Sequence, residues 1–125
     1  DYTERAILIL QRILPQNTYG LAILNNNIGG IYSYYMGEHS RALSYLEQAL
    51  HMRERSLPAN HPDIGTSYNK IGEAYFHLRE FSAALYHFEN ALTLYRRTLP
   101  NNHLKIVNLS RQISAAKAKI AVNQM

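Results

Sequence analysis

The strongest constraint on the fold is an internal repeat of 42 or 43 residues. The dipeptide Leu-Pro begins at positions 14, 57 and 99, so the three starts lie 43 and 42 residues apart. Small, apolar and aromatic residues recur at fixed offsets from these starts. The matched pairs are Gly29 with Gly72, Tyr32 with Tyr75, Ala42 with Ala84, Leu46 with Phe88, and Ala49 with Ala91. Self-similarity at this period is typical of stacked repeat architectures.

Each complete unit has the pattern of two helices joined by a tight turn. In the second unit, apolar residues recur every three or four positions over two stretches, which is the spacing of one helix face. The first stripe is Ile64, Tyr68, Ile71, Gly72, Tyr75 and Leu78, and the second is Phe81, Ala84, Leu85, Phe88, Ala91, Leu92 and Tyr95. Only Arg79-Glu80 separates the stripes, so the two helices must be antiparallel. Because a lone pair cannot bury its apolar stripe, we expect the pairs to stack into a solenoid.

These residues resemble the tetratricopeptide repeat. Its pattern of aromatic residue, Leu-Gly, Tyr, Ala and Phe at fixed offsets is met by Tyr68, Ile71-Gly72, Tyr75, Ala84 and Phe88. The 42-residue period, the segment LPANHPD at 57–63 and the triplet LNN at 24–26 resemble the kinesin light chain type. The resemblance covers nearly the whole chain. It implies an all-α, right-handed superhelical solenoid of antiparallel helix pairs, with about six helices.

The repeat divides the chain into a half repeat (1–14), two complete repeats (15–56 and 57–98) and a last segment (99–125). The predicted helices cover 2–13, 18–35, 38–55, 61–78, 80–97 and 102–122. The inward-facing residues of the first helix are expected to be Ala6, Ile7, Leu10 and Ile13. The last segment is either a capping helix or a diverged repeat cut short. The reason is that the repeat's aromatic residue, Gly and Tyr are replaced there by Ser110, Ser114 and Lys117.

The extra residue of the first unit can be placed. Tyr32 and Ala42 are ten positions apart, whereas Tyr75 and Ala84 are nine apart. The insertion therefore lies in 33–41, nearest to 34–36, and we expect a widened turn or a π-type bulge there.

Other local signals predict helix crossings and helix ends. Gly29 is expected at a close crossing of two helices, as is Gly72, whereas Gly30 is matched by Glu73 and has no such explanation. Asn60 is expected to cap the helix that follows it. Four arginines near predicted helix C-termini are expected to offset helix dipoles, namely Arg53, Arg55, Arg96 and Arg97.

Length and composition restrict the class of protein. A chain of 125 residues is one domain by length. It has no apolar run of about 18 residues, so no membrane span is expected. The start has no signal-peptide pattern and there is no cysteine, which fits a cytoplasmic protein. Because the chain opens in the second half of a repeat, we expect a segment of a longer protein. The net charge is +4, and residues 96–125 contain six Lys or Arg and no acid.

The resemblance places a peptide groove on the concave wall that the first helices of stacked units would form. On the second unit, the face opposite the core stripe is Thr66, Asn69, Lys70, Glu73 and His77. One repeat earlier, the equivalent face is Ile23, Asn26, Asn27, Gly30 and Tyr34. One repeat later, it is Asn108, Arg111, Gln112, Ala115 and Lys119. The predicted peptide-binding residues are Asn26, Asn27, Thr66, Asn69, Lys70, Glu73, His77, Asn108, Arg111 and Gln112.

The chemistry of this face favours an acidic peptide. Asn side chains offer a donor and an acceptor to a peptide backbone, and Lys70 and Arg111 would attract acidic groups. The alternative is a merely solvated helix face. We expect no enzyme, cofactor or metal, since no His pair or Ser-His-Asp set has a readable spacing. A nucleic-acid partner is not expected either, because no aromatic residues interleave with the last cations.

Two functions remain open. One is an adaptor segment that binds a short, acidic peptide of a protein partner. The other is a structural spacer or self-associating unit of a larger scaffold, whose exposed terminal helices stack end to end on neighbouring repeats.

Overall fold

The computed structural model describes residues 2–13 and 18–124, which form six α-helices and no strand. The helices are α1 (Tyr2–Ile13), α2 (Thr18–Tyr34), α3 (His39–Ser56), α4 (Pro62–His77), α5 (Phe81–Thr98) and α6 (Leu104–Asn123). Every predicted helix is confirmed, with ends that differ by at most two residues. No helix in this part of the chain is long and apolar enough to cross a membrane.

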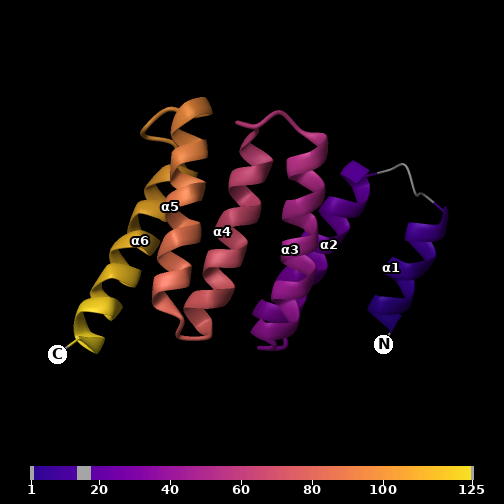
Figure 1. The fold of residues 1–125 in the computed structure, drawn as a ribbon, viewed down its shortest axis with the longest axis horizontal. Helices are drawn as coiled ribbons and strands as arrows, with labels where there is room; N and C mark the ends of the chain where they lie inside the picture. The colour runs from indigo at the N-terminus through magenta and orange to yellow at the C-terminus, as the bar shows by residue number, and fades with distance from the viewer. Residues whose placement is uncertain (1, 14–17, 125) are drawn as a thin grey trace.

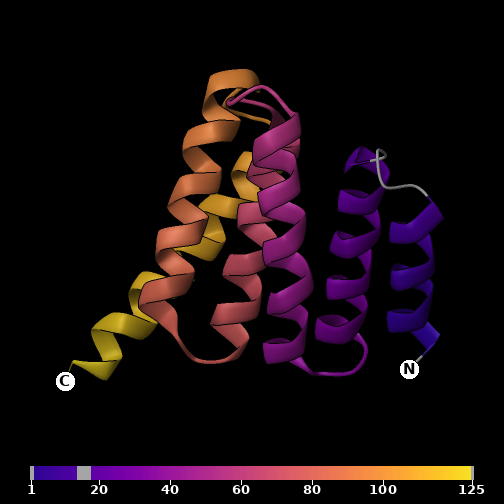
Figure 2. The same ribbon diagram turned by 45° about the vertical axis from the view of Figure 1, so that its right-hand side comes forward.

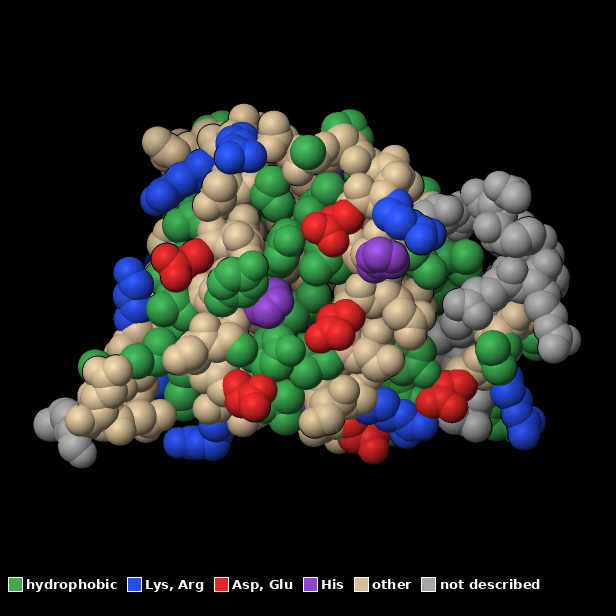
Figure 3. All heavy atoms as spheres, viewed as in Figure 1, with side chains coloured by type: hydrophobic (Ala, Val, Ile, Leu, Met, Phe, Trp, Pro, Cys, Tyr) green, Lys and Arg blue, Asp and Glu red, His purple; other side chains and the backbone are tan. Residues whose placement is uncertain are grey.

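The helices lie side by side in a row, with the two chain ends at opposite ends of the row (Figure 1, Figure 2). Within each complete repeat, α2 packs on α3 and α4 packs on α5. Between repeats, α3 packs on α4, α5 packs on α6, and the first helices α2 and α4 also touch. In the view of Figure 3, acidic side chains are scattered over the face made by α3 and α5, whereas most Lys and Arg side chains lie toward its edges.

The core consists of the residues that define the repeat. Ala42, Leu46 and Ala49 of α3 are buried, and so are their equivalents Ala84, Phe88 and Ala91 of α5. Ala42 and Leu46 belong to a hydrophobic cluster that also contains buried residues of α2 and α4, and Ala84, Phe88 and Ala91 belong to one that also contains buried residues of α6. Tyr75 packs against both clusters, so the core runs continuously from one repeat into the next.

Two glycines lie at close helix crossings, as predicted. A Cβ atom added to Gly72 would lie 2.6 Å from the Phe88 ring, and one added to Gly29 would lie 2.6 Å from Leu46. In both cases the carbonyl oxygen of an alanine on the second helix is 3.2 Å from that Cβ. Gly30 differs, because an added Cβ would meet nothing within 4 Å. The repeat therefore uses glycine where its two helices approach most closely.

The extra residue of the first unit widens the turn between α2 and α3. In the second unit, the Glu80 N–H donates to the carbonyl of Tyr75, five residues back. In the first unit, the equivalent Glu38 N–H donates to Tyr32, six residues back. The residue before each glutamate has a positive φ, 66° at Gly37 and 64° at Arg79. The prediction of a widened turn is confirmed, and α2 remains α-helical up to Tyr34.

The prediction that Ala6 faces inward is wrong. Ala6 is exposed, whereas its equivalents Ala49 and Ala91, on the second helices of complete repeats, are fully buried. Among the described residues, α1 has no first helix of its own repeat beside it. The side chains of Ile7, Leu10 and Ile13 lie outside the described part of the structure.

The cap of α4 also differs from the prediction. His61, not Asn60, is the N-cap residue, and its Nδ1 accepts a hydrogen bond from the Asp63 N–H at 3.0 Å. The same arrangement recurs at α6, where Nδ1 of His103 accepts from the Lys105 N–H at 3.1 Å. Asn60 is used between helices instead, since its Oδ1 accepts from Nη1 of Arg97 at 2.8 Å.

Arg53 lies in the last turn of α3, as predicted, but it is buried rather than a surface cation. Its Nη1 donates to the Asp63 carbonyl at 3.1 Å and to Oγ of Ser67 at 2.9 Å. Both acceptors belong to α4, so Arg53 joins the first repeat to the second.

Candidate peptide-binding face

Two cavities flank α4 among the first helices, and together they contain six of the ten predicted site residues. The α2–α4 cavity has a volume of about 530 Å³ and is lined by Asn26, Asn27, Gly30, Ile31, Tyr34, Tyr35 and Lys70. The α4–α6 cavity has a volume of about 230 Å³ and is lined by Glu73, Phe76, His77, Phe88, Gln112 and Ala115. Lys70 and Glu73 lie one turn apart on α4. Lys70 lines the α2–α4 cavity and Glu73 lines the α4–α6 cavity, so the boundary between the cavities runs between them.

Polar contacts hold α2 and α4 together at this boundary. The Tyr34 hydroxyl donates to Oε2 of Glu73 at 2.6 Å, although the two residues are 39 positions apart. Nζ of Lys70 lies 5.1 Å from the centroid of the Tyr34 ring and 3.8 Å from Oε1 of Glu73. Burial and the neighbouring Glu73 carboxylate raise the pKa of Tyr34 to about 12, so Tyr34 remains a hydrogen-bond donor. The first helices of adjacent repeats are thus joined by side chains that also line the cavities.

The first helices carry buried amide oxygens without hydrogen-bond partners in the described chain. They are Oδ1 of Asn25, Asn26 and Asn69 and Oε1 of Gln112, two of them on α2 and one each on α4 and α6. An unsatisfied buried acceptor costs about 1–3 kcal/mol, so a donor from a ligand is favoured at such a position. Asn26 is among the residues that line the α2–α4 cavity, and Gln112 is among those that line the α4–α6 cavity.

The other four predicted residues line neither cavity. Thr66 turns toward α5, where its Oγ1 is 2.8 Å from the Tyr95 hydroxyl. Asn69 is half-buried, and Asn108 is exposed on α6. Arg111 belongs to a different surface. The predicted residues therefore do not form one continuous line across α2, α4 and α6. Six of them line the two cavities on either side of α4.

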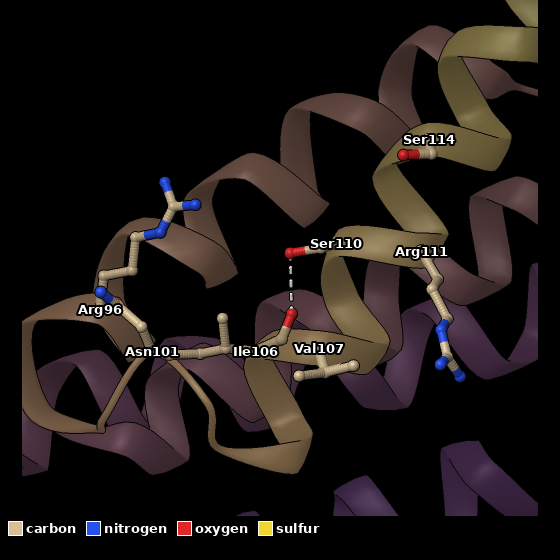
Figure 4. A pocket seen from close by; sticks show the side chains of 7 residues that line it. All are labelled: Arg96, Asn101, Ile106, Val107, Ser110, Arg111 and Ser114. Atoms are coloured by element: carbon tan, nitrogen blue, oxygen red, sulfur yellow. Dashed lines mark hydrogen bonds between the residues drawn. The ribbon is translucent and has the colours of Figure 1, made fainter.

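Arg111 lines the α5–α6 cavity, a third hollow of about 730 Å³. Its other lining residues are Arg96, Asn101, Ile106, Val107, Ser110 and Ser114. In Figure 4, Arg96 and Arg111 lie at opposite sides of the group, and Ser110 Oγ donates to the Ile106 carbonyl at 2.9 Å. Ser110 is thereby bonded within its own helix. This cavity lies on α5 and α6 and has no residue of α4.

Sequence reasoning missed three features of this face. Tyr35 lines the α2–α4 cavity and is 85% exposed, and Phe76 and Phe88 line the smaller cavity. A signal for Tyr35 existed, because Tyr35 lies in the segment 34–36, where the sequence places the extra residue of the first unit. Phe88 showed no such signal, since it is also a core residue of the repeat.

A stacked histidine pair at the end of this face was also missed. The rings of His39, on α3, and His77, on α4, have centroids 4.7 Å apart and planes 14° apart. Nδ1 of His39 is 2.7 Å from Oγ of Ser33. Burial and the nearby His77 lower the pKa of His39 below its ordinary value. In the described part of the chain, no group of three or more His, Cys, Asp or Glu could hold a metal ion.

Comparison with known proteins agrees with this architecture. The sequence matches the family model for the tetratricopeptide repeat over residues 20–111. None of the curated proteins matches the chain. The crystal structure of the nearly identical TPR-like repeats of a putative kinesin light chain from Podosopora anserina matches with a TM-score of 0.84 and 18% identity. The crystal structure of a single-substitution variant of the same repeats matches with a TM-score of 0.85 and the same identity.

In both cases the match covers 95% of this chain and 56% of the other chain, so this chain spans a little over half of their length. The likeness confirms the helical repeat fold. Tetratricopeptide repeats form a fold that generally mediates protein–protein interaction and is not itself enzymatic. The match over residues 20–111 covers most of the sequence, and the chain therefore belongs to the tetratricopeptide repeat family.

Proposed function

We propose that the face formed by the α2–α4 and α4–α6 cavities binds a short, extended segment of a protein partner. The observation that carries the proposal is the pair of cavities on either side of α4, each with a buried amide oxygen that lacks a partner among the described residues. A peptide backbone has one N–H donor per non-proline residue, so an extended segment carries enough donors for both oxygens. Its side chains would occupy the cavities.

The charge of the larger cavity favours an acidic residue at one end of the peptide. Lys70 is the only Lys or Arg among the seven described residues that line the α2–α4 cavity, and none of the seven is Asp or Glu. Its side chain is 32% exposed, so its charge is only partly screened. Tyr34 and Tyr35 add donors and apolar surface beside it. Acidic specificity is thus proposed for the α2–α4 cavity, with Lys70 as the residue that provides it.

Calorimetry with an acidic peptide tests the proposal. The peptide is an acetylated and amidated eight-residue sequence of Asp and Ala, titrated at two salt concentrations. Lys70→Ala should weaken binding and flatten its salt dependence, because exposed charges are screened within about 8 Å at physiological salt. Lys117→Ala is the matched control, since Lys117 is exposed and lines none of the three cavities. Arg111→Ala shows whether the site extends along α6. Equal affinities for wild type and Lys70→Ala would contradict the proposed role of Lys70.

The alternative function, a spacer or self-associating unit, is favoured by the terminal helices. Leu8 and Ile9 of α1 are 60% and 55% exposed, and Leu104 and Val122 of α6 are 68% and 63% exposed. Exposed apolar side chains at both ends of a repeat array suit stacking on further repeats. Sedimentation over a range of concentrations tests the self-associating form of this function, for which the mass should rise with concentration. A cytoplasmic location, and the absence of a nucleic-acid partner, stay predictions.

A further inference from the structure

The α4–α6 cavity differs from its neighbour in size and in charge. Its volume of about 230 Å³ is below the range of about 300–1,000 Å³ that is usual for small-molecule sites, so it suits a single side chain. Phe88 of α5 lies within it between the two first helices and is itself only 1% exposed. Of the six described lining residues none is Lys or Arg, and one, Glu73, is an acid.

Two of the side chains that line this cavity, Glu73 and Gln112, carry acceptor oxygens. Oε1 of Gln112 is buried and has no hydrogen-bond partner among the described residues. Glu73 accepts one hydrogen bond, from Tyr34, and its other oxygen is 3.8 Å from Nζ of Lys70. A carboxylate has about four acceptor positions, so Glu73 retains capacity for a further donor. With 21% exposure, its charge is less screened than that of a surface glutamate.

We propose that the α4–α6 cavity is a subsite for a lysine side chain of the bound segment, an inference that rests on the proposed peptide-binding function. The lysine stem would pack on Phe76 and Phe88, and its ammonium group would lie between Gln112 Oε1 and the Glu73 carboxylate. A lysine brings an apolar stem and three donors, and its charge is also attracted to aromatic faces.

Other side chains fit this chemistry less well. An acidic side chain would face the Glu73 carboxylate, and like charges repel. An aliphatic side chain would leave Gln112 Oε1 buried without a donor. An arginine fork is matched to two parallel acceptors on one group, whereas here the acceptors come from different helices. Lysine is therefore the occupant that satisfies both acceptors.

The two cavities together give the site a polarity. The α2–α4 cavity presents the Lys70 cation and the α4–α6 cavity presents the Glu73 anion, so the ligand should carry an acid and a lysine in complementary positions. This pattern restricts the partner far more than acidity alone.

Amide chemical shifts of the isotope-labelled protein test the subsite. The probe is N-acetyl-lysine methylamide, and the comparison compound is N-acetyl-norleucine methylamide, which has the same stem without the ammonium group. We expect the lysine compound to shift the amides of Glu73, Phe76 and Ala115, with an affinity about tenfold higher than that of norleucine. Glu73→Gln keeps an acceptor for Tyr34 but removes the charge, so it should abolish this preference. Glu89→Gln, on the exposed face of α5, is the control and should retain it.

The outcomes separate this inference from the proposed function. If norleucine binds as well as lysine, if the lysine shifts lie elsewhere, or if none appear at about 50 mM, far above a millimolar dissociation constant, the subsite is refuted. In each of these cases the acidic peptide can still bind at Lys70, and the proposed function stands. If the lysine compound shifts this cavity while no acidic peptide binds, the proposed function fails and the subsite stands.

Discussion

The same substitution at two glycines of the first helices should have opposite effects on stability. Gly72→Ala places a methyl group 2.6 Å from two atoms of the Phe88 ring and 3.2 Å from the Ala84 carbonyl oxygen. Phe88 is 1% exposed and enclosed by the core, so the ring cannot move away freely. Overpacking of this kind typically costs about 1–3 kcal/mol. The gain in helix propensity returns only about 1 kcal/mol. We expect a net loss of about 1 kcal/mol.

Gly30→Ala is the matched control, because the new methyl group would meet nothing within 4 Å. Only the propensity gain then remains, so the free energy of unfolding should rise by about 0.5–1 kcal/mol. Urea unfolding followed by circular dichroism measures both changes, with the slope compared to verify that the same surface unfolds. A Gly72→Ala protein as stable as wild type would refute the close-crossing argument. A destabilised Gly30→Ala protein would refute the assignment of Gly30 to open space.

Three further predictions concern stability. Arg79→Gly should raise the free energy of unfolding by about 0.5–1 kcal/mol, since Arg79 has a φ of 64°; an unchanged urea midpoint would contradict this. Arg53→Met should cost about 1–3 kcal/mol by leaving Ser67 Oγ unpaired, and adding Ser67→Ala should recover most of the loss in a double-mutant cycle. The lowered pKa of His39 means that the unfolded chain binds its proton more tightly, so stability should fall as pH drops below about 6.5. His39→Asn should flatten that pH profile.

The fold was predictable because the contacts that hold it repeat in the sequence. Gly72 against Phe88 has its counterpart in Gly29 against Leu46, and both pairs appear at one period. The wider turn was predictable for the same reason, since comparing the lengths of the two complete units shows where the first has an extra residue. The exposure of Ala6 was not predictable from the pattern, because a repeat position is buried only where its partner helix is present.

Hydrogen bonds between the polar side chains of different helices were not predictable. The repeat places Arg53 in one unit and Tyr95 at the equivalent position of the next. Arg53 donates to Ser67, whereas Tyr95 contacts the hydroxyl of Thr66. Both solutions fill the end of a second helix with a polar group that reaches α4. The spacing of apolar residues alone does not predict that Arg53 is buried. It also does not predict that the Thr66 hydroxyl is hydrogen-bonded to Tyr95.

The candidate site is harder to predict from the sequence than the fold, because helix-packing positions repeat between units and positions on the open face do not. Positions that pack one helix on another are nearly identical in the two complete units, because both must bury the same crossing. Positions on the open side of the first helices differ at each step, and Gly30, Glu73 and Ala115 occupy one such position in three successive units. Their differences make the two cavities unequal: an open glycine lines the larger, and a carboxylate lines the smaller. The partner specificity that we propose for this chain therefore depends on positions at which the three units differ.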